Sequence, residues 1–235
     1  MSDPTPPPLT PTSSAKRLMR IQALSGLVFA VFVSLHLGNV MVSAFGPGLY
    51  DAFQVSIRPL YQNPVIELGV LATALVVHIV VGILRIRRRP RSRGWARLPL
   101  RTRLHRMSAY FLLLVIVGHI TATRAPTLLE GFWIGFAGLS FSMESMPGIF
   151  YPYYLALGLC GLLHGGYGSY LALRSLGVSL PSVSRLGPWV ILPMIIAAIL
   201  VTLGVLSFGG HLYAIDDPWQ SDFAQFAEEY FGVER

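Results

Sequence analysis

The chain has little cysteine and little charge, and both shortages restrict what it can be. Its 235 residues include one cysteine, Cys160. A disulfide framework, a cysteine-held iron–sulfur centre and a C-x-x-C-H site for covalent haem all need more than one. Charged residues make up 12% of the sequence, hydrophobic residues make up 53%, and the mean hydropathy is +0.59. These values are typical of an integral membrane protein.

Carboxylates are also missing from the interior of the apolar segments. Five such segments lie near 21–44, 65–86, 107–123, 152–173 and 188–208, and Glu67 stands only at the outer end of the second. Each approaches the ~20 residues that a helix needs to cross a hydrocarbon core of about 30 Å. The first is too long for the apolar part of a cleaved signal peptide, so we expect it to be retained. The sequence therefore predicts an all-α integral membrane protein with five transmembrane helices.

Positive charge is distributed unevenly between the two ends of these segments. Of the 18 Lys and Arg residues, 15 precede the first segment, or lie between the second and third or between the fourth and fifth. The other ends carry Arg58, Arg124 and Arg235, together with ten of the eleven carboxylates. The positive-inside rule then places the N-terminus in the cytoplasm and the C-terminus outside. The net charge of +7 is a topology signal and not one of nucleic-acid binding; lipid head groups and a cytoplasmic protein are the partners that suit the basic loop.

The two ends of the chain differ in composition from the membrane domain, which we expect to cover residues 18–210. Residues 1–17 are rich in Pro, Ser and Thr, which predicts a disordered cytoplasmic tail. Residues 211–235 are expected outside the membrane as a tail. Five of them would share one face of an amphipathic helix, with a loosely ordered tail as the alternative: Phe223, Phe226, Ala227, Tyr230 and Phe231.

An internal repeat carries the histidines. The segment RIQALSGLVFAVFVSLH ends at His36, and RLHRMSAYFLLLVIVGH ends at His119; both begin with Arg and have Ser five residues later. Each is followed by a second apolar segment with one histidine and a glycine four residues on, at His78 and His164. One histidine alone could be a core residue with a polar partner. One in each of four successive spans, within a duplicated two-helix unit, favours function.

The depth of each histidine predicts how they pair. His36 and His119 both lie 16 residues beyond a cytoplasmic Arg, or roughly 24 Å at 1.5 Å per residue. His78 and His164 precede the inner basic residues of their helices by seven and ten residues, or roughly 10–15 Å. Two bis-histidine haem b sites, stacked across a four-helix bundle, follow from these depths. Haem iron with two imidazoles has no open position and transfers electrons. Structural zinc, the rival, wants four ligands at one depth.

With these histidines, the chain resembles the five-helix, dihaem cytochrome b subunit of succinate:quinone oxidoreductases and fumarate reductases (complex II). The similarity covers about residues 18–210. It rests on the five spans, the histidine spacings of 42, 41 and 45, and the segments SGLVFAVFVSLH and HRMSAYFLLLVIVGH. One departure is Leu162, where some members carry a Glu that serves a transmembrane proton path.

The resemblance implies a location, partners and cofactors. The protein would lie in a bacterial cytoplasmic membrane, with flavoprotein and iron–sulfur subunits on the cytoplasmic side performing the succinate or fumarate chemistry. His78 and His164 would ligate the haem next to the iron–sulfur subunit, and His36 and His119 the outer haem. The quinone would be menaquinone, and a homo-oligomer of the complex is compatible with the resemblance.

Further candidate residues follow from the chemistry of these groups. A quinone site needs hydrogen-bond partners and an acid–base group, for which we favour Glu67 and Arg124; anchoring of helix ends is the alternative. Anionic haem propionates suit basic and hydroxyl side chains. On the inner side these are Arg20, Ser25, Arg103, Arg106 and Ser108. His105 and His211 are expected at the membrane interfaces, and His105 could reach an inner propionate.

Small residues near the histidines would let a flat macrocycle approach the backbone, with helix–helix packing as the alternative: Gly38, Gly82, Gly118, Gly165, Gly166 and Gly168. Two other functions stay open. One is the haem b subunit of a different respiratory dehydrogenase, of the hydrogenase or formate type. The other is a haem-free transport or structural protein in which the histidines are polar contacts between helices.

Overall fold

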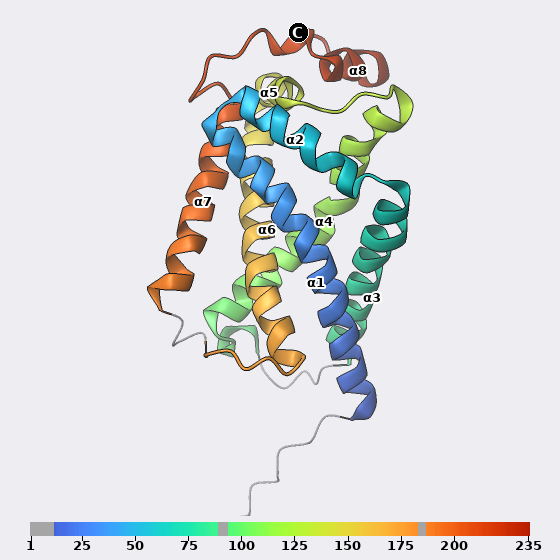
Figure 1. Cartoon of the computed structure of the whole chain (residues 1–235), viewed down its shortest axis with the longest axis vertical. Coiled ribbons are helices and arrows are strands. Elements are labelled where there is room, and N and C mark those ends of the chain that lie inside the picture. Colours follow the sequence, from blue (N-terminus) through green and yellow to red (C-terminus); the bar gives the residue numbers. More distant parts are fainter. Residues whose placement is uncertain (1–11, 89–93, 183–186) are drawn as a thin grey trace, which may run out of the picture.

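The computed structural model describes residues 12–88, 94–182 and 187–235, and its regular elements in these ranges are all helical. Five long helices form the body of the molecule (Figure 1). The second of them continues a π-helical segment, η2, and a short 3₁₀ turn, η3 (Trp95–Arg97), precedes the third. The bounds are α1 (Ser13–Val42), η2 (Val65–Ala72) with α3 (Thr73–Arg87), α4 (Leu100–Leu129), α6 (Pro147–Ser175) and α7 (Pro188–Phe208).

Four helical stretches in the described residues are long and apolar enough to cross a membrane: Ser13–Phe45, Val65–Arg87, Leu100–Leu129 and Pro188–Phe208. Their large apolar side chains are turned outward, as shown by Leu114 at 82% exposure and Trp189 at 88%. In water such exposure would be unfavourable, whereas lipid tails solvate these side chains. The protein is therefore a multi-pass membrane protein.

The helix α6 is not among these four, although its 29 residues exceed the length that a span requires. Its outer half contains Tyr151, Pro152, Tyr153 and Tyr154, which lower its mean hydropathy. The fourth predicted span, near 152–173, thus has the length of a membrane helix without the same apolar composition.

The observed bounds differ from the predicted segments in instructive places. α7 has the predicted bounds, but α1 begins at Ser13, so 13–17 of the predicted tail are helical; residues 1–11 lie outside the described part. The first outer connection contains a helix, α2 (Pro47–Tyr61). Its turn-forming residues act at the helix start: Gly46 adopts φ 127° and Pro47 occupies the first turn, where a missing N–H has no cost.

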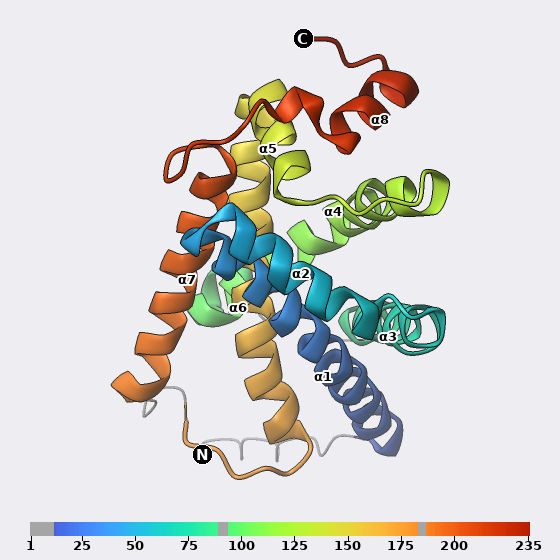
Figure 2. The same ribbon diagram turned by 45° about the horizontal axis from the view of Figure 1, so that its top comes forward.

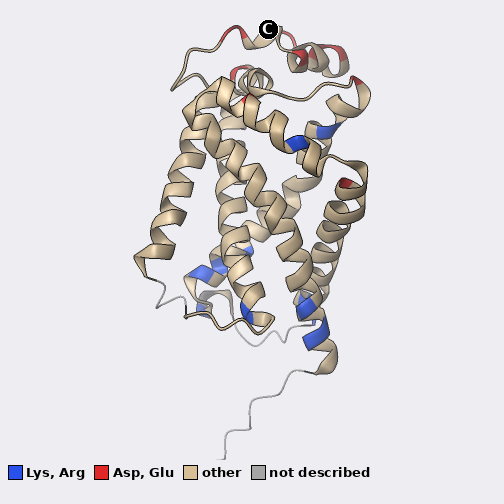
Figure 3. Cartoon of the chain, in the orientation of Figure 1, with Lys and Arg blue, Asp and Glu red and all other residues tan. Residues whose placement is uncertain are grey.

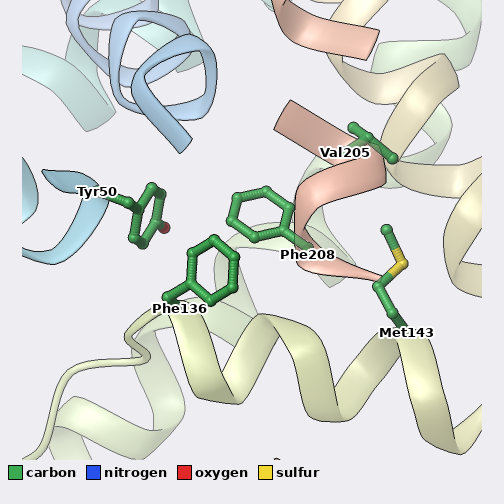
Figure 4. Packing of buried hydrophobic residues seen from close by; sticks show 5 residues of the cluster. All are labelled: Tyr50, Phe136, Met143, Val205 and Phe208. Atoms are coloured by element: carbon green, nitrogen blue, oxygen red, sulfur yellow. The ribbon is translucent and has the colours of Figure 1, made fainter. Parts of the chain in front are cut away.

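A layer of shorter elements covers one end of the bundle, as Figures 1 and 2 show. It comprises η1 (Ser43–Phe45), α2, α5 (Phe136–Ser145), η5 (Pro218–Gln220) and α8 (Asp222–Phe231). Its centre is an apolar cluster of Tyr50, Phe136, Met143, Val205 and Phe208 (Figure 4). The Tyr50 ring lies 5.3 Å from that of Phe208 and 5.8 Å from that of Phe136. This cluster fixes α2 and α5 to the outer end of α7.

The C-terminal helix α8 occupies the position where the sequence predicts an amphipathic helix. Ser221 caps its start by accepting a hydrogen bond from the Ala224 N–H, and Gly232 ends it in the left-handed conformation. Phe226 and Ala227 are buried, whereas Phe231, which was assigned to the same face, is 71% exposed. Only part of the predicted face packs onto the molecule.

The long helices are arranged so that opposite members do not touch extensively. α1 packs against α3 and α6, and α6 packs against α4 and α7. Within the described residues, no extensive packing joins α1 to α4, α3 to α6, or α3 to α4. Most basic residues gather at one end of this bundle and most acidic residues at the other (Figure 3).

Close packing of α7 depends on a glycine, which provides a test of the fold. A Cβ at Gly204 would overlap the carbonyl oxygen of Val40, whereas one at Gly69 would meet nothing within 4 Å. We predict that Gly204→Ala lowers the thermal midpoint in detergent by a few °C, since overpacking costs about 1–3 kcal/mol. Gly69→Ala is the matched helical control and should not lower it. Equal midpoints for the two variants would contradict the close approach of α7 to α1.

Candidate functional site

The four repeat histidines meet in two pairs, each across a diagonal of the bundle. His36 of α1 and His119 of α4 have ring centroids 5.9 Å apart, with 72° between the ring planes. His78 of α3 and His164 of α6 have centroids 6.2 Å apart, with 87° between the planes. These are the same two pairs that the depths estimated from the sequence predicted. The rings lie between helices that are not otherwise packed together.

The separation within each pair matches two imidazoles that share one metal. With metal–nitrogen bonds of about 2 Å and ring centres about 1 Å behind the nitrogens, the centroids would lie roughly 6 Å apart. Both observed distances agree with this value. Within the described residues, no group of three or more His, Cys, Asp and Glu side chains is placed to share a metal. Structural zinc would need more ligands than either pair provides.

Hydrogen bonds orient three of the four rings in the same way. Nδ1 of His78 lies 3.1 Å from the carbonyl oxygen of Gln22, and Nδ1 of His164 lies 3.4 Å from that of His105. Nδ1 of His119 lies 3.4 Å from the hydroxyl oxygen of Tyr153. A carbonyl partner requires Nδ1 to carry the proton, which leaves the Nε2 lone pair available for a metal. Within the described residues, Nε2 of all four rings has no hydrogen-bond partner.

The two carbonyls belong to equivalent positions of the internal repeat. Ser25 donates its hydroxyl to the carbonyl of Gln22 at 3.2 Å, and Ser108 donates to that of His105 at 2.9 Å. Each carbonyl thus serves a serine three residues later and an imidazole from the next helix of its half. The serines were predicted as propionate contacts, but their hydroxyls are already used by their own helices. Duplication has preserved a serine–carbonyl–histidine arrangement.

Glycines near the pairs serve two different purposes. A Cβ at Gly26 would lie 2.7 Å from Cε1 of His78, so this position must be small for the ring to fit. Beside the outer pair, a Cβ at Gly38 or Gly118 would meet no atom within 4 Å. The other glycines named as possible macrocycle contacts lie against side chains: Gly82 on Gln22, Gly165 on Val33, Gly166 on Met194 and Gly168 on His105. Packing explains the small residue at Gly82, Gly166 and Gly168, whereas a Cβ at Gly165 would make only an ordinary contact.

The sequence suggested a surface position for His105, but its ring is packed against other rings. Its ring stacks on that of His164, with centroids 4.4 Å apart and 9° between the planes. Its Nδ1 is buried without a hydrogen-bond partner among the described residues. The signal was present in the sequence, because His105 precedes the repeat serine Ser108 by three residues, as Gln22 precedes Ser25. His211, by contrast, lies at the outer surface with Nε2 2.8 Å from the Tyr151 hydroxyl.

The remaining inner candidates are dispersed around the basic end. Arg20 is exposed, whereas Arg103 and Arg106 are half-buried. Nε of Arg103 is buried without a partner among the described residues. Whether these three arginines contact haem propionates stays a prediction.

Glu67 and Arg124, the residues predicted at the quinone site, form a two-point ion pair at the outer end. Nε of Arg124 lies 2.5 Å from Oε1 of Glu67, and Nη2 donates to Oε2 at 2.9 Å. The Arg124 side chain is 18% exposed and that of Glu67 is 25% exposed. This bond joins η2 to α4, two neighbours that the helix packing leaves apart.

Sequence reasoning missed Arg58 and its neighbours on α2. Arg58 is 7% exposed, its Nη2 donates to the carbonyl of Ile134 at 3.1 Å, and its guanidinium carbon lies 5.4 Å from the centre of the Trp133 ring. Gln54 donates to the same carbonyl at 3.1 Å. Burial lowers the pKa of Arg58 and raises that of Tyr61. The helix that carries Arg58 was expected to be a loop, so no periodicity indicated that Arg58 is buried.

A recess of about 370 Å³ opens in the outer layer between α2, the segment before α5 and the start of α8. Asp51, one of its lining residues, accepts a hydrogen bond from the Phe136 N–H at 2.8 Å, and burial raises its pKa. None of the four paired histidines lines this recess. It is separate from the candidate site.

Comparison of the chain with protein-family models, curated proteins and solved structures gives no match. The site is therefore interpreted from its own chemistry. Two imidazole pairs at two levels, each with unbonded Nε2 atoms, can each hold a metal centre in the bundle interior.

The Glu67–Arg124 pair can be tested by a double-mutant cycle on thermal stability. We predict that Glu67→Gln and Arg124→Gln each lower the free energy of unfolding, because each leaves a partly buried group unpaired. The double variant should be no less stable than the less stable of the two single variants. The coupling free energy between the two side chains should be about 1 kcal/mol. Strictly additive losses would show that the two side chains do not interact in the folded protein.

Proposed function

We propose that the chain is a dihaem cytochrome b that anchors a succinate dehydrogenase or fumarate reductase complex and passes electrons between an iron–sulfur partner and membrane quinone. The observation that carries this proposal is the pair of diagonal histidine contacts with centroid separations of 5.9 and 6.2 Å. Haem bound between two imidazoles supplies reversible one-electron transfer without an open ligand position. The residues present fit it: the ring centroids of each pair have the spacing of two imidazoles on one metal, and the Nε2 atoms have no hydrogen-bond partner among the described residues.

The chain's own residues would set the orientation of each ligand. The carbonyls of Gln22 and His105 fix the inner rings of His78 and His164, and the Tyr153 hydroxyl fixes His119. The two carbonyls keep the proton on Nδ1 of His78 and His164 and raise the basicity of Nε2. At the inner site, the stacked ring of His105 also restricts the tilt of His164. In the outer pair, Phe32 stacks on His36 at 5.7 Å.

The arrangement of charge supports a direction through the membrane. We infer that the basic end faces the cytoplasm of a bacterium, which places the N-terminus inside and the C-terminus outside. α6 then also spans the membrane, beside the four more apolar helices, because it pairs with α3 through His78 and His164. The inner pair lies closer to the basic end, where the iron–sulfur and flavoprotein subunits would dock. The succinate or fumarate chemistry belongs to those subunits.

The outer end offers a place for quinone. The Glu67–Arg124 pair lies there, between η2 and α4, with both side chains partly exposed. Arg124 can donate to a quinone carbonyl, and Glu67 can transfer a proton on reduction or oxidation. We propose menaquinone as the quinone, on the resemblance to dihaem members of complex II. A hydrogenase- or formate-type dehydrogenase would share the haem sites, so the subunits that co-purify with the chain distinguish these complexes.

The pairing of the histidines predicts the outcome of single substitutions. The wild-type protein should show two b-type components in a reduced-minus-oxidised spectrum. We predict that His36→Ala and His119→Ala abolish one component, and that His78→Ala and His164→Ala abolish the other. His211→Ala, outside both pairs, should retain both. A haem-free wild-type protein would sink the proposed function, and loss of components in other combinations would sink the pairing.

Gly26 gives a second test that leaves all four histidines in place. A leucine at this position would occupy the space of the His78 ring, from which a Cβ already lies only 2.7 Å away. We predict that Gly26→Leu removes or strongly weakens the spectral component that His78→Ala removes, and spares the other. Gly48→Leu, at a helical glycine with no atom within 4 Å of a Cβ, is the control and should retain both.

A further inference from the structure

Arg58 is a buried cation without an anion. Its side chain lies at the outer end of the bundle on α2, and one of its three nitrogens, Nη2, has a partner in the Ile134 carbonyl. Nε and Nη1 are both buried and have no hydrogen-bond partner among the described residues. Buried donors in folded proteins are nearly always satisfied, by protein, water or a bound group. The Tyr61 hydroxyl also interacts with the Arg58 guanidinium, but Nε and Nη1 keep no hydrogen bond among the described residues, which indicates room for a further acceptor.

The charge of Arg58 also lacks compensation. A guanidinium stays protonated at physiological pH, even where burial lowers its pKa. No ion pair within 4 Å in the described residues includes Arg58. Asp51 of the same helix interacts with Arg58 only at longer range and accepts a hydrogen bond from the Phe136 N–H, and the Glu67 carboxylate bonds to Arg124 at two points. Arg124 itself has a buried Nη1 without a partner. An uncompensated buried charge is strongly unfavourable, so this end of the bundle suits an additional anion.

A chain of ring contacts connects this cation to the outer histidine pair. Tyr61 follows Arg58 by one turn of α2, and its ring meets the Phe32 ring edge-on at 5.1 Å. Phe32 in turn stacks on His36 at 5.7 Å. Arg58 thus belongs to the layer just outside the His36–His119 pair. At the inner end the candidate serines are bonded to their own helices and Arg20 is exposed. Arg103 there has one buried nitrogen without a partner among the described residues, whereas Arg58 has two.

We propose that Arg58 binds a propionate carboxylate of the haem held between His36 and His119, so that this haem directs its propionates toward the outer face. The inference rests on the proposed function and adds an anion site to it. Nε and Nη1 supply the donors, and the carboxylate supplies the missing negative charge. A charge-assisted bond of this kind is stronger than a neutral one. By the same electrostatics, Arg58 favours the reduced form of the outer haem.

The experiment is a redox titration of the purified complex with three variants. The outer component is the one that is lost in His36→Ala. Arg58→Gln should lower its midpoint potential by about 59 mV, which is a tenfold shift in the reduction equilibrium. Arg58→Lys keeps the charge but not the planar fork, and should shift it less. Arg174→Gln is the control at the inner end, where Arg174 contacts Tyr170, and should leave the outer potential unchanged.

A second titration identifies the propionate as the partner. Haem b and haem b dimethyl ester, whose propionates are capped, are each incorporated into wild-type and Arg58→Gln complexes. With haem b the variant should retain the outer haem more weakly than the wild type, whereas with the diester the two proteins should retain it equally, because the ester has no charge to pair with Arg58. The inner component reports that each variant is folded.

The outcomes separate the two ideas. Wild-type complex that binds no haem overturns the proposed function and this inference with it. Two bound haems with an unshifted outer potential in Arg58→Gln overturn the inference alone. An equal loss of outer-haem retention with haem b and with the diester assigns Arg58 to a different anion, such as a lipid phosphate, and likewise overturns it.

Discussion

The arrangement of this bundle depends on imidazoles that reach across its diagonals. Adjacent helices pack directly, α1 against α3 and α6, and α6 against α4. Opposite helices meet only through side chains, and at two levels those side chains are paired histidines. A polar ring inside a membrane bundle is unfavourable without a partner, and here the Nδ1 atoms of His78, His164 and His119 are satisfied by two carbonyls and a hydroxyl. The Nε2 side of each ring stays available for a group bound between the helices.

The inner pair illustrates how duplication builds such a site. The carbonyls of Gln22 and His105 occupy equivalent positions in the repeat, and each accepts from a serine and from an imidazole. The halves have since diverged, since Gly26 of the first copy corresponds to Ala109 of the second. Gly26 is needed because the His78 ring lies against it. The two ligands of one centre therefore have related backbone partners and different side-chain surroundings.

The sequence predicted the features that depend on periodicity and spacing. The apolar segment at 188–208 is the helix α7, and helix rise alone paired His36 with His119 and His78 with His164. The outer layer was not predicted, because Pro47 and Gly46 read as turn residues although they start a helix. The burial of Arg58 could not be predicted either, since it arises from contacts with Ile134 and Trp133, far away in the sequence. Nor does composition indicate that the hydroxyls of Ser25 and Ser108 bond to their own helices.

The π-helical geometry of η2 changes which faces of the continuous helix η2–α3 carry Glu67 and His78. Its wider turns accommodate an extra residue between Glu67 and His78 relative to an ordinary helix, and π-helical turns recur where proteins place functional side chains. Because each α-helical residue turns the chain by about 100°, one residue more or fewer would rotate Glu67 to another face while His78 stayed in place. The widened turns thus allow one continuous helix to direct the Glu67 carboxylate toward α4 and the His78 imidazole toward α6. In an evolving chain, a single inserted residue would suffice to set these two directions independently.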